Sequence, residues 1–130
     1  MTQKSQLRLT LEAPTRARSC EPVPLVFTVT NAGPTALTLQ LLGRTPTADF
    51  RVWNSRGQLV WSRLRGRTLL GALRLLPLDA GKSLVFRGVW KQRTDAGRPV
   101  EPGEYRIQGV LLTDDPDGLS SHAARLSIAR

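Results

Sequence analysis

Apolar and polar residues alternate along most of this chain, in short segments that are separated by turn residues. A period of two places the apolar side chains on one face of a strand and the polar side chains on the other. Eight segments follow this pattern: residues 7–11, 23–29, 37–41, 50–52, 59–61, 84–90, 105–111 and 124–128. With turn signals about every ten residues, the pattern predicts an all-β fold, an antiparallel β-sandwich of about seven to nine strands.

Three stretches between these segments have the composition of turns. They are Asn31-Ala-Gly-Pro34, Asn54-Ser-Arg-Gly57, which is typical of a hairpin, and Asp114-Asp-Pro-Asp-Gly118. Inside the predicted strands, Pro24 donates no backbone hydrogen bond, so we expect it at the beginning or on an unpaired side of its strand. Gly88 interrupts an apolar row, which indicates a bulge or a close approach of another group.

The length of 130 residues suits one compact domain, so we predict a single domain over residues 1–130. Residues 63–78 fit the strand pattern least well, because Leu69, Leu73 and Leu76 have helical spacing. Glycines and Pro77 leave room for only a couple of helical turns there. We therefore expect a long loop that contains a short helix or strand.

The sequence also bears on location. Its single cysteine, Cys20, excludes an internal disulfide, so the chain is not a disulfide-stapled secreted scaffold. No run approaches the roughly 20 apolar residues of a membrane span. The first six residues are polar, and no apolar signal segment precedes Cys20. We expect a cytoplasmic protein, unless a signal segment has been removed.

Residues for catalysis or metal binding are scarce. One histidine, His122, and one cysteine supply too few ligands for a zinc site. Ser120 and Ser121 precede His122, but no strained nucleophile turn accompanies them, and His122 falls at a strand edge. The aspartates of residues 114–118 lack the bidentate glutamate of a calcium loop, and no glycine-rich phosphate motif is present. We predict no catalytic residues, no metal and no cofactor, and conclude that the chain is not an enzyme.

The charge is the unusual feature of the composition. Lys and Arg number 19 against 10 acidic residues, a formal net charge of +9, which favours an acidic partner. The densest basic group is Arg63, Arg65, Arg67 and Arg74, in the leucine-bearing loop. These residues either contact a partner or simply keep a loop solvated. Nucleic-acid binding is a weaker alternative, because Trp53 is the one aromatic residue with a parity that exposes it.

Five pieces in order along the chain carry a resemblance to a known family. They are Pro22-Val-Pro-Leu-Val-Phe-Thr-Val-Thr-Asn31, Asp49-Phe50-Arg-Val52, Gly57-Gln-Leu-Val-Trp61-Ser62, Leu78-Asp-Ala-Gly81 before a strand that ends at Val89-Trp90, and Val100-Glu-Pro-Gly103-Glu-Tyr105. Over residues 22–113 the chain resembles the BsuPI-type intracellular proteinase inhibitor domain. It departs from the family in Leu41-Leu-Gly-Arg-Thr45, which lacks an aromatic–x–Ser–Gly stretch, and in Ala80, which replaces a proline.

The resemblance implies an immunoglobulin-like sandwich and gives roles to its large residues. Tyr105 would return its hydroxyl to the backbone as in a tyrosine corner, and Gly81 and Gly103 would occupy turn positions with positive φ. Trp61 and Trp90 would fill the space between the sheets. The core residues expected from this and from the strand pattern are Phe27, Phe50, Trp61, Phe86, Trp90 and Tyr105.

The resemblance further implies a non-enzymatic module with a protein partner, an intracellular serine protease that it inhibits through an exposed loop. The best candidate is the loop of residues 63–74, with Arg63, Arg65, Arg67 and Arg74 as contacts, followed by residues 43–48 and 92–100. Two alternatives stay open. One is an immunoglobulin-like interaction domain without inhibitory activity, and the other is a basic domain that binds nucleic acid or an anionic surface.

Overall fold

The structure is a computed structural model that describes residues 6–42, 48–64, 73–113 and 119–130. These residues contain eleven β-strands: β1 (Leu7–Glu12), β2 (Arg16–Arg18), β3 (Val23–Asn31), β4 (Leu37–Leu42), β5 (Ala48–Asn54), β6 (Leu59–Ser62), β7 (Leu73–Leu78), β8 (Ser83–Trp90), β9 (Gly103–Leu111), β10 (Leu119–Ser120) and β11 (Ala124–Ala129). All eight segments predicted from the alternation are strands, so the all-β prediction is confirmed. The strand number exceeds the predicted seven to nine, because β2 and β10 were not predicted and β7 was expected only as a short helix or strand within a long loop.

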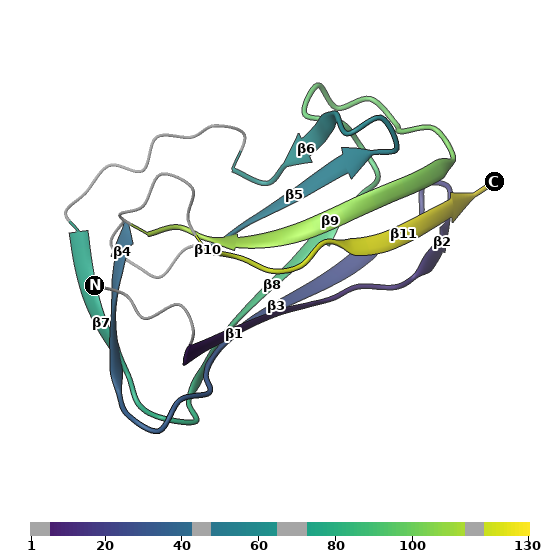
Figure 1. Ribbon diagram of the computed structural model, residues 1–130. Coiled ribbons are helices and arrows are strands. Elements are labelled where there is room, and N and C mark those ends of the chain that lie inside the picture. Colours follow the sequence, from purple (N-terminus) through teal and green to yellow (C-terminus); the bar gives the residue numbers. More distant parts are fainter. Residues whose placement is uncertain (1–5, 43–47, 65–72, 114–118) are drawn as a thin grey trace.

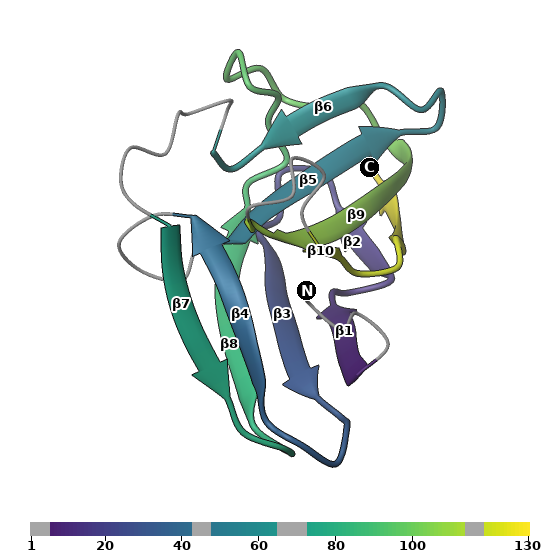
Figure 2. The ribbon, with the colours of Figure 1, turned by 60° about the vertical axis from the view of Figure 1, so that its left-hand side comes forward.

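The strands form two packed layers with a separate two-stranded sheet at one side (Figures 1 and 2). One layer has the order β1-β3-β8, the other has the order β2-β11-β9-β5-β6 with β10 paired to β9, and β4 and β7 pair separately. Every pairing is antiparallel except that of β2 with β11. This arrangement is the predicted immunoglobulin-like sandwich.

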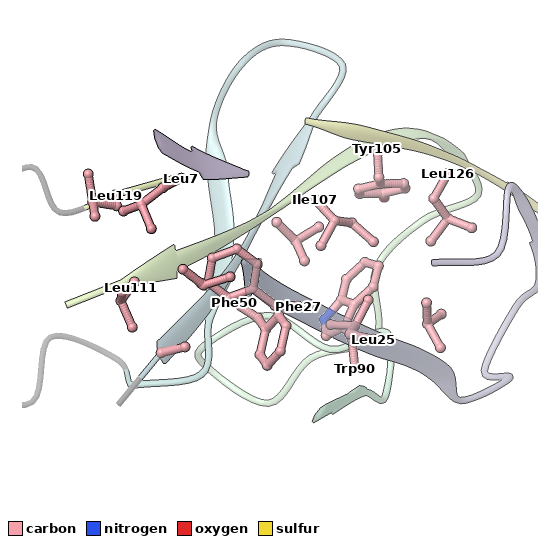
Figure 3. Packing of buried hydrophobic residues seen from close by; sticks show 14 of the residues in the cluster. Leu7, Leu25, Phe27, Phe50, Trp90, Tyr105, Ile107, Leu111, Leu119 and Leu126 are labelled. Atoms are coloured by element: carbon pink, nitrogen blue, oxygen red, sulfur yellow. The ribbon is translucent and has the colours of Figure 1, made fainter. Parts of the chain in front are cut away.

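Alternation along each strand directs one row of side chains between the layers. In β3, Val23, Leu25, Phe27 and Val29 are buried and the residues between them are not. Figure 3 shows Phe27, Phe50 and Trp90 packed together, with Ile107, Tyr105 and Leu126 over them from β9 and β11. Burial of such rows is the main favourable contribution to folding.

The six expected core residues are not equally buried. Phe27, Phe50 and Trp90 are fully buried and Tyr105 is 7% exposed, whereas Trp61 and Phe86 are half-buried and pack against the cluster from its rim. Trp61 lies on β6 and Phe86 on β8, both edge strands, although Trp90 at the end of β8 is covered by the rings of Trp61 and Tyr105. Ring contacts still join both to the core, because Trp61 lies 6.3 Å from Trp90 and Phe86 lies 6.0 Å from Phe27.

Leu59 departs from the pattern, since its side chain is 49% exposed. The pairing of β5 with β6 shifts between Val52 and Trp53, so that Val52 faces Trp61 but Trp53 faces Leu59. An extra residue in one strand reverses the faces beyond it. The expectation that Leu59 shares the inner face with Trp61 was therefore wrong.

Gly88 allows the two layers to approach each other. A Cβ on this residue would lie 2.8 Å from Cε2 of Phe50, closer than side-chain atoms pack. The β3–β8 register runs through Gly88 opposite Leu25 without a shift. Of the two predicted alternatives, the close approach is present and the bulge is not.

The structure also tests the predictions for two turn glycines, for Pro24 and for the leucines of residues 73–78. Gly81 and Gly103 have φ of 80° and 150°, as predicted for their turns, and Pro24 is the second residue of β3. Residues 73–78 form a strand paired along its length with β4, so Leu73 and Leu76 belong to a strand and not to a helix. Leu69 and the predicted turn of residues 114–118 lie outside the described residues. Within the described ranges, no helix is long and apolar enough to cross a membrane.

Candidate functional site

One end of the sandwich carries the ends of three chain segments that the structure does not describe. Leu42 at the end of β4 faces Leu73 at the start of β7, and Leu41 bridges to Thr113. Leu111 of β9 pairs with both Ala48 and Leu119. The described residues that flank the stretches 43–47, 65–72 and 114–118 therefore lie beside one another, where β4, β7 and β10 meet in Figure 1. We call this region the loop end and define it by Leu42, Ala48, Leu64, Leu73, Thr113 and Leu119.

Arg63, one of the predicted contact residues, is used inside the fold. Its guanidinium donates from Nη2 to the carbonyl of Ala48 at 2.6 Å and from Nη1 to the carbonyl of Arg87 at 3.1 Å. It also lies over the Phe50 ring, with 4.7 Å between Cζ and the ring centroid. Because Ala48 is in β5 and Arg87 in β8, Arg63 connects the two layers and its guanidinium faces inward.

Burial lowers the pKa of Arg63 from its ordinary value, while the nearby Asp49 carboxylate acts in the opposite direction and raises it. Desolvation disfavours the charged form, and an opposite charge favours it. A guanidinium nevertheless stays charged in proteins. Arg63 is thus a cation held at the base of the loop end.

Asp49 is buried and fixes the chain where it leaves β6. Its Oδ2 accepts hydrogen bonds from Ser62 Oγ at 2.7 Å and from Arg51 Nε at 3.0 Å, and its Oδ1 accepts one from the backbone of Leu64 at 3.1 Å. The backbone of Ser62 donates to Oδ1 of Asp95 at 3.0 Å. Charge-assisted hydrogen bonds of this kind are the strong ones. They hold the last described residues before 65–72 in a fixed position.

The four predicted contact arginines do not form one described cluster. Arg63 is half-buried and hydrogen-bonded as described above, Arg74 is exposed on β7 opposite Leu41, and Arg65 and Arg67 lie outside the described residues. Of the predicted loop 43–48, the structure describes Ala48, which lies at the loop end. The predicted loop 92–100 does not lie there, because it joins β8 to β9 at the other end of β9.

That opposite end is held by side chains that sequence reasoning missed. Gln92 is buried with a φ of 58°, and its amide donates to the carbonyls of Arg18 at 2.7 Å and Glu21 at 2.9 Å. Its oxygen accepts from the backbone of Cys20 at 3.2 Å. A polar residue two positions after the end of β8 gave no signal of burial. Asp49 and Ser62, in contrast, stand in two of the pieces that carry the family resemblance.

Tyr105 forms the predicted corner at the same end. Its hydroxyl donates to the carbonyl of Glu101, and its ring packs 5.6 Å from Trp90. Burial raises the pKa of Tyr105, and the charge of Glu101 raises it further. Trp90 donates from Nε1 to the carbonyl of Arg93 at 2.9 Å, so both large side chains satisfy their polar atoms.

Ser120, Ser121 and His122, which precede the last strand, differ in burial and in hydrogen bonding. Ser121 is buried, and its Oγ accepts a hydrogen bond from the backbone of Gly109 at 3.0 Å, whereas Ser120 and His122 are exposed. Among the described residues, no three His, Cys, Asp or Glu side chains are grouped so that they could hold a metal ion.

Comparison with solved structures agrees with the fold. The chain superposes on a CARDB domain of Pyrococcus furiosus with a TM-score of 0.50 and 15% identity, covering 95% of this chain and 94% of that one. It superposes on the alkylpurine DNA glycosylase AlkC of Pseudomonas fluorescens, bound to DNA with an abasic site analog, with a TM-score of 0.54 and 16% identity, covering 96% of this chain and 31% of that one. It superposes on the β-glucosidase EmGH1 of Erythrobacter marinus with a TM-score of 0.53 and 14% identity, covering 95% of this chain and 15% of that one. At these identities the likeness concerns the fold alone.

Comparison at the family level is more specific. No curated protein sequence matches this chain. The sequence model of the BsuPI family, described as intracellular proteinase inhibitor, matches residues 9–116. This range contains every piece of the resemblance noted in the sequence and extends well beyond half of the chain. The chain therefore belongs to the BsuPI family of intracellular proteinase inhibitors.

Proposed function

We propose that this protein inhibits a serine protease in the cytoplasm by placing the loop end in the active-site cleft of the enzyme. The observation that carries the proposal is that the described residues on either side of 43–47, 65–72 and 114–118 lie together at one end of the sandwich. Membership of the BsuPI family supports proteinase inhibition as the activity. A fixed base reduces the conformational freedom that an inhibitor loop can lose on binding, which favours association.

Within this proposal the arginines have different roles. Arg65 and Arg67 contact the protease, and Arg74 flanks the contact on β7. Arg63 is a positioning residue, because its hydrogen bonds to Ala48 and Arg87 hold the base of the loop end. An arginine side chain pairs bidentately with a carboxylate, so the favoured target is a protease with an acidic specificity pocket.

The test is inhibition of a purified intracellular serine protease that cleaves after arginine, measured with a fluorogenic substrate. The double variant Arg65→Ala/Arg67→Ala should raise the inhibition constant at least about tenfold, the size expected for central arginine contacts. The control is Arg8→Ala/Arg16→Ala, which removes the same charge from exposed positions on β1 and β2. Equal inhibition constants for both double variants would contradict the assigned contact.

A second function, protein binding without inhibition, also has support. Chains that share this fold include segments of much larger enzymes, since the sandwich covers only 31% and 15% of two of them. A fold of this kind therefore serves in several settings. Calorimetric binding to the protease with full residual activity at saturation would favour this second function over inhibition.

A further inference from the structure

The outer face of the larger sheet has a basic hollow that is separate from the loop end. The hollow has a volume of about 740 Å³ and lies over β5, β9, β11 and the turn between β5 and β6. Its lining includes Trp53, Arg56, Glu104, Arg106, Gln108 and Arg125. Figure 1 shows β5, β9 and β11 side by side beneath this face.

The centre of the hollow is a row of three side chains across neighbouring strands. Trp53 of β5 is paired with Arg106 of β9, and Arg106 is paired with Arg125 of β11. Side chains of paired residues lie on the same face, about 5 Å apart at Cβ. Trp53 is half-buried, while Arg106 and Arg125 are exposed.

The two arginines oppose each other without compensation from a carboxylate. Like charges that are directly opposite destabilise a sheet. In the part of the chain that the structure describes, neither Arg106 nor Arg125 has an ion-pair partner. The nearby Glu104 instead accepts a hydrogen bond from Ser127 Oγ at 2.6 Å. Two guanidinium groups are thus left available for an anionic ligand, and the fold bears their repulsion when no ligand is bound.

The walls of the hollow are held in place before any ligand binds. Oδ1 of Asn54 accepts the backbone hydrogen bonds of Arg56 and Gln58, each at 3.0 Å, which fixes the turn that carries Arg56. Gln108 donates from Nε2 to the carbonyl of Ser121 at 3.0 Å, which fixes the floor. A preorganised site binds with a smaller loss of conformational entropy.

From this geometry we propose that the hollow binds an acidic peptide segment of a partner protein. Carboxylates of the segment pair with Arg106 and Arg125, Arg56 closes over one side, and an apolar or aromatic residue of the segment packs on the Trp53 indole. Arginine pairs bidentately with carboxylates and stacks on aromatic surfaces. A single-stranded nucleic acid suits the site less well, because it calls for successive aromatic platforms, and this hollow has one indole and also contains Glu104.

Fluorescence anisotropy with the full chain tests this proposal. The probe is a fluorescein-labelled peptide of aspartate and glutamate residues around one phenylalanine, and the competitor is an unlabelled single-stranded oligonucleotide. The double variant Arg106→Gln/Arg125→Gln should weaken peptide binding at least about tenfold. Trp53→Ala should weaken it as well, and far more for this peptide than for one in which alanine replaces the phenylalanine.

The control is Arg8→Gln/Arg87→Gln, which removes the same charge from exposed positions of the other sheet, on β1 and β8. An equal loss of affinity in both double variants would overturn the proposal, since the peptide would then respond only to net charge. Tighter binding of the oligonucleotide than of the peptide would overturn it in favour of nucleic acid. The melting temperature of Arg106→Gln/Arg125→Gln should not fall below that of the native chain, because the change relieves like-charge repulsion. The site does not depend on the proposed protease inhibition, so either can fail alone.

Discussion

Trp90 and Trp61 show how much the position of a residue within its sheet decides its contribution. Both have the inward parity of a strand, yet Trp90 is fully buried and Trp61 is half-buried. Trp90 contacts Tyr105 and Trp61 and donates from Nε1 to the carbonyl of Arg93. Both residues lie on edge strands, Trp61 on β6 and Trp90 on β8, so strand order does not separate them. Trp90 is the last residue of β8, where the Tyr105 ring and the backbone of Arg93 cover it. From the alternation in the sequence alone, both residues were expected to be equally buried in the core.

Replacement of each tryptophan should therefore have a different effect on stability. Trp90→Ala leaves a large cavity and should lower the free energy of unfolding by about 3–5 kcal/mol. Trp61→Ala removes a half-buried ring and should lower it by only about 1–2 kcal/mol. Urea denaturation measures both values. Losses of the same size in the two variants would contradict the difference in burial.

Tyr105 links stability to alkaline pH. Burial, and after it the charge of Glu101, raises the pKa of its phenol in the folded state. The neutral hydroxyl therefore contributes stability that is fully present below the unfolded pKa of about 10 and is lost as the pH rises through the folded value. Tyr105 is the only tyrosine in the sequence, so absorbance at 295 nm titrates it alone. We expect a midpoint above 10 in the folded protein, and a midpoint at or below 10 would refute the burial of the hydroxyl.

At the scale of elements, the alternation of apolar and polar residues predicted eight of the strands. It did not predict the short or irregular strands. β2 and β10 have three and two residues, too few for a period to be read. In residues 73–78, Leu73 and Leu76 have helical spacing, and only the pairing with β4 shows that they belong to a strand. Leu59 lies on the opposite face from the one that alternation predicts, because the register between β5 and β6 shifts. Such a shift depends on both strands together and cannot be read from either one alone.

The candidate site was harder to predict than the strands, for a related reason. Arg63 looked like part of an exposed basic run, but its guanidinium reaches carbonyls in β5 and β8 that are distant in sequence. Gln92 was overlooked because its partners, Arg18 and Glu21, lie more than 70 positions away. The hollow at Trp53, Arg106 and Arg125 depends on the register of three strands. Contacts between strands of different hairpins are absent from local patterns.

The bridge made by Arg63 gives a prediction at this scale. Arg63→Ala should lower the free energy of unfolding by about 1–3 kcal/mol, because it leaves the carbonyls of Ala48 and Arg87 without this donor. Arg87→Ala, which removes an exposed side chain from the same strand, is the control and should change stability by less than about 0.5 kcal/mol. Thermal and urea denaturation report both. A loss from Arg63→Ala no larger than that of the control would show that the bridge contributes nothing.

At the scale of the whole molecule, the net charge of +9 is divided among separate places. Arg63 stabilises the packing of the layers, the loop end carries Arg65 and Arg67 in its sequence, and the hollow on the outer face holds Arg56, Arg106 and Arg125. The loop end is anchored by Asp49, and the opposite end by Gln92 and Tyr105. The molecule thus combines a sandwich with two regions for which we propose different protein partners.

The most direct test of the proposed mode of inhibition is hydrogen–deuterium exchange of the full chain, alone and in complex with a serine protease that it inhibits. Binding through the loop end predicts that exchange slows at residues that flank it, above all 41–49, 62–74 and 111–119, while β1, β2 and residues 92–100 keep their free rates. Slowed exchange confined to residues 92–100 or to the outer face of β9 and β11, with none at the loop end, would contradict the account.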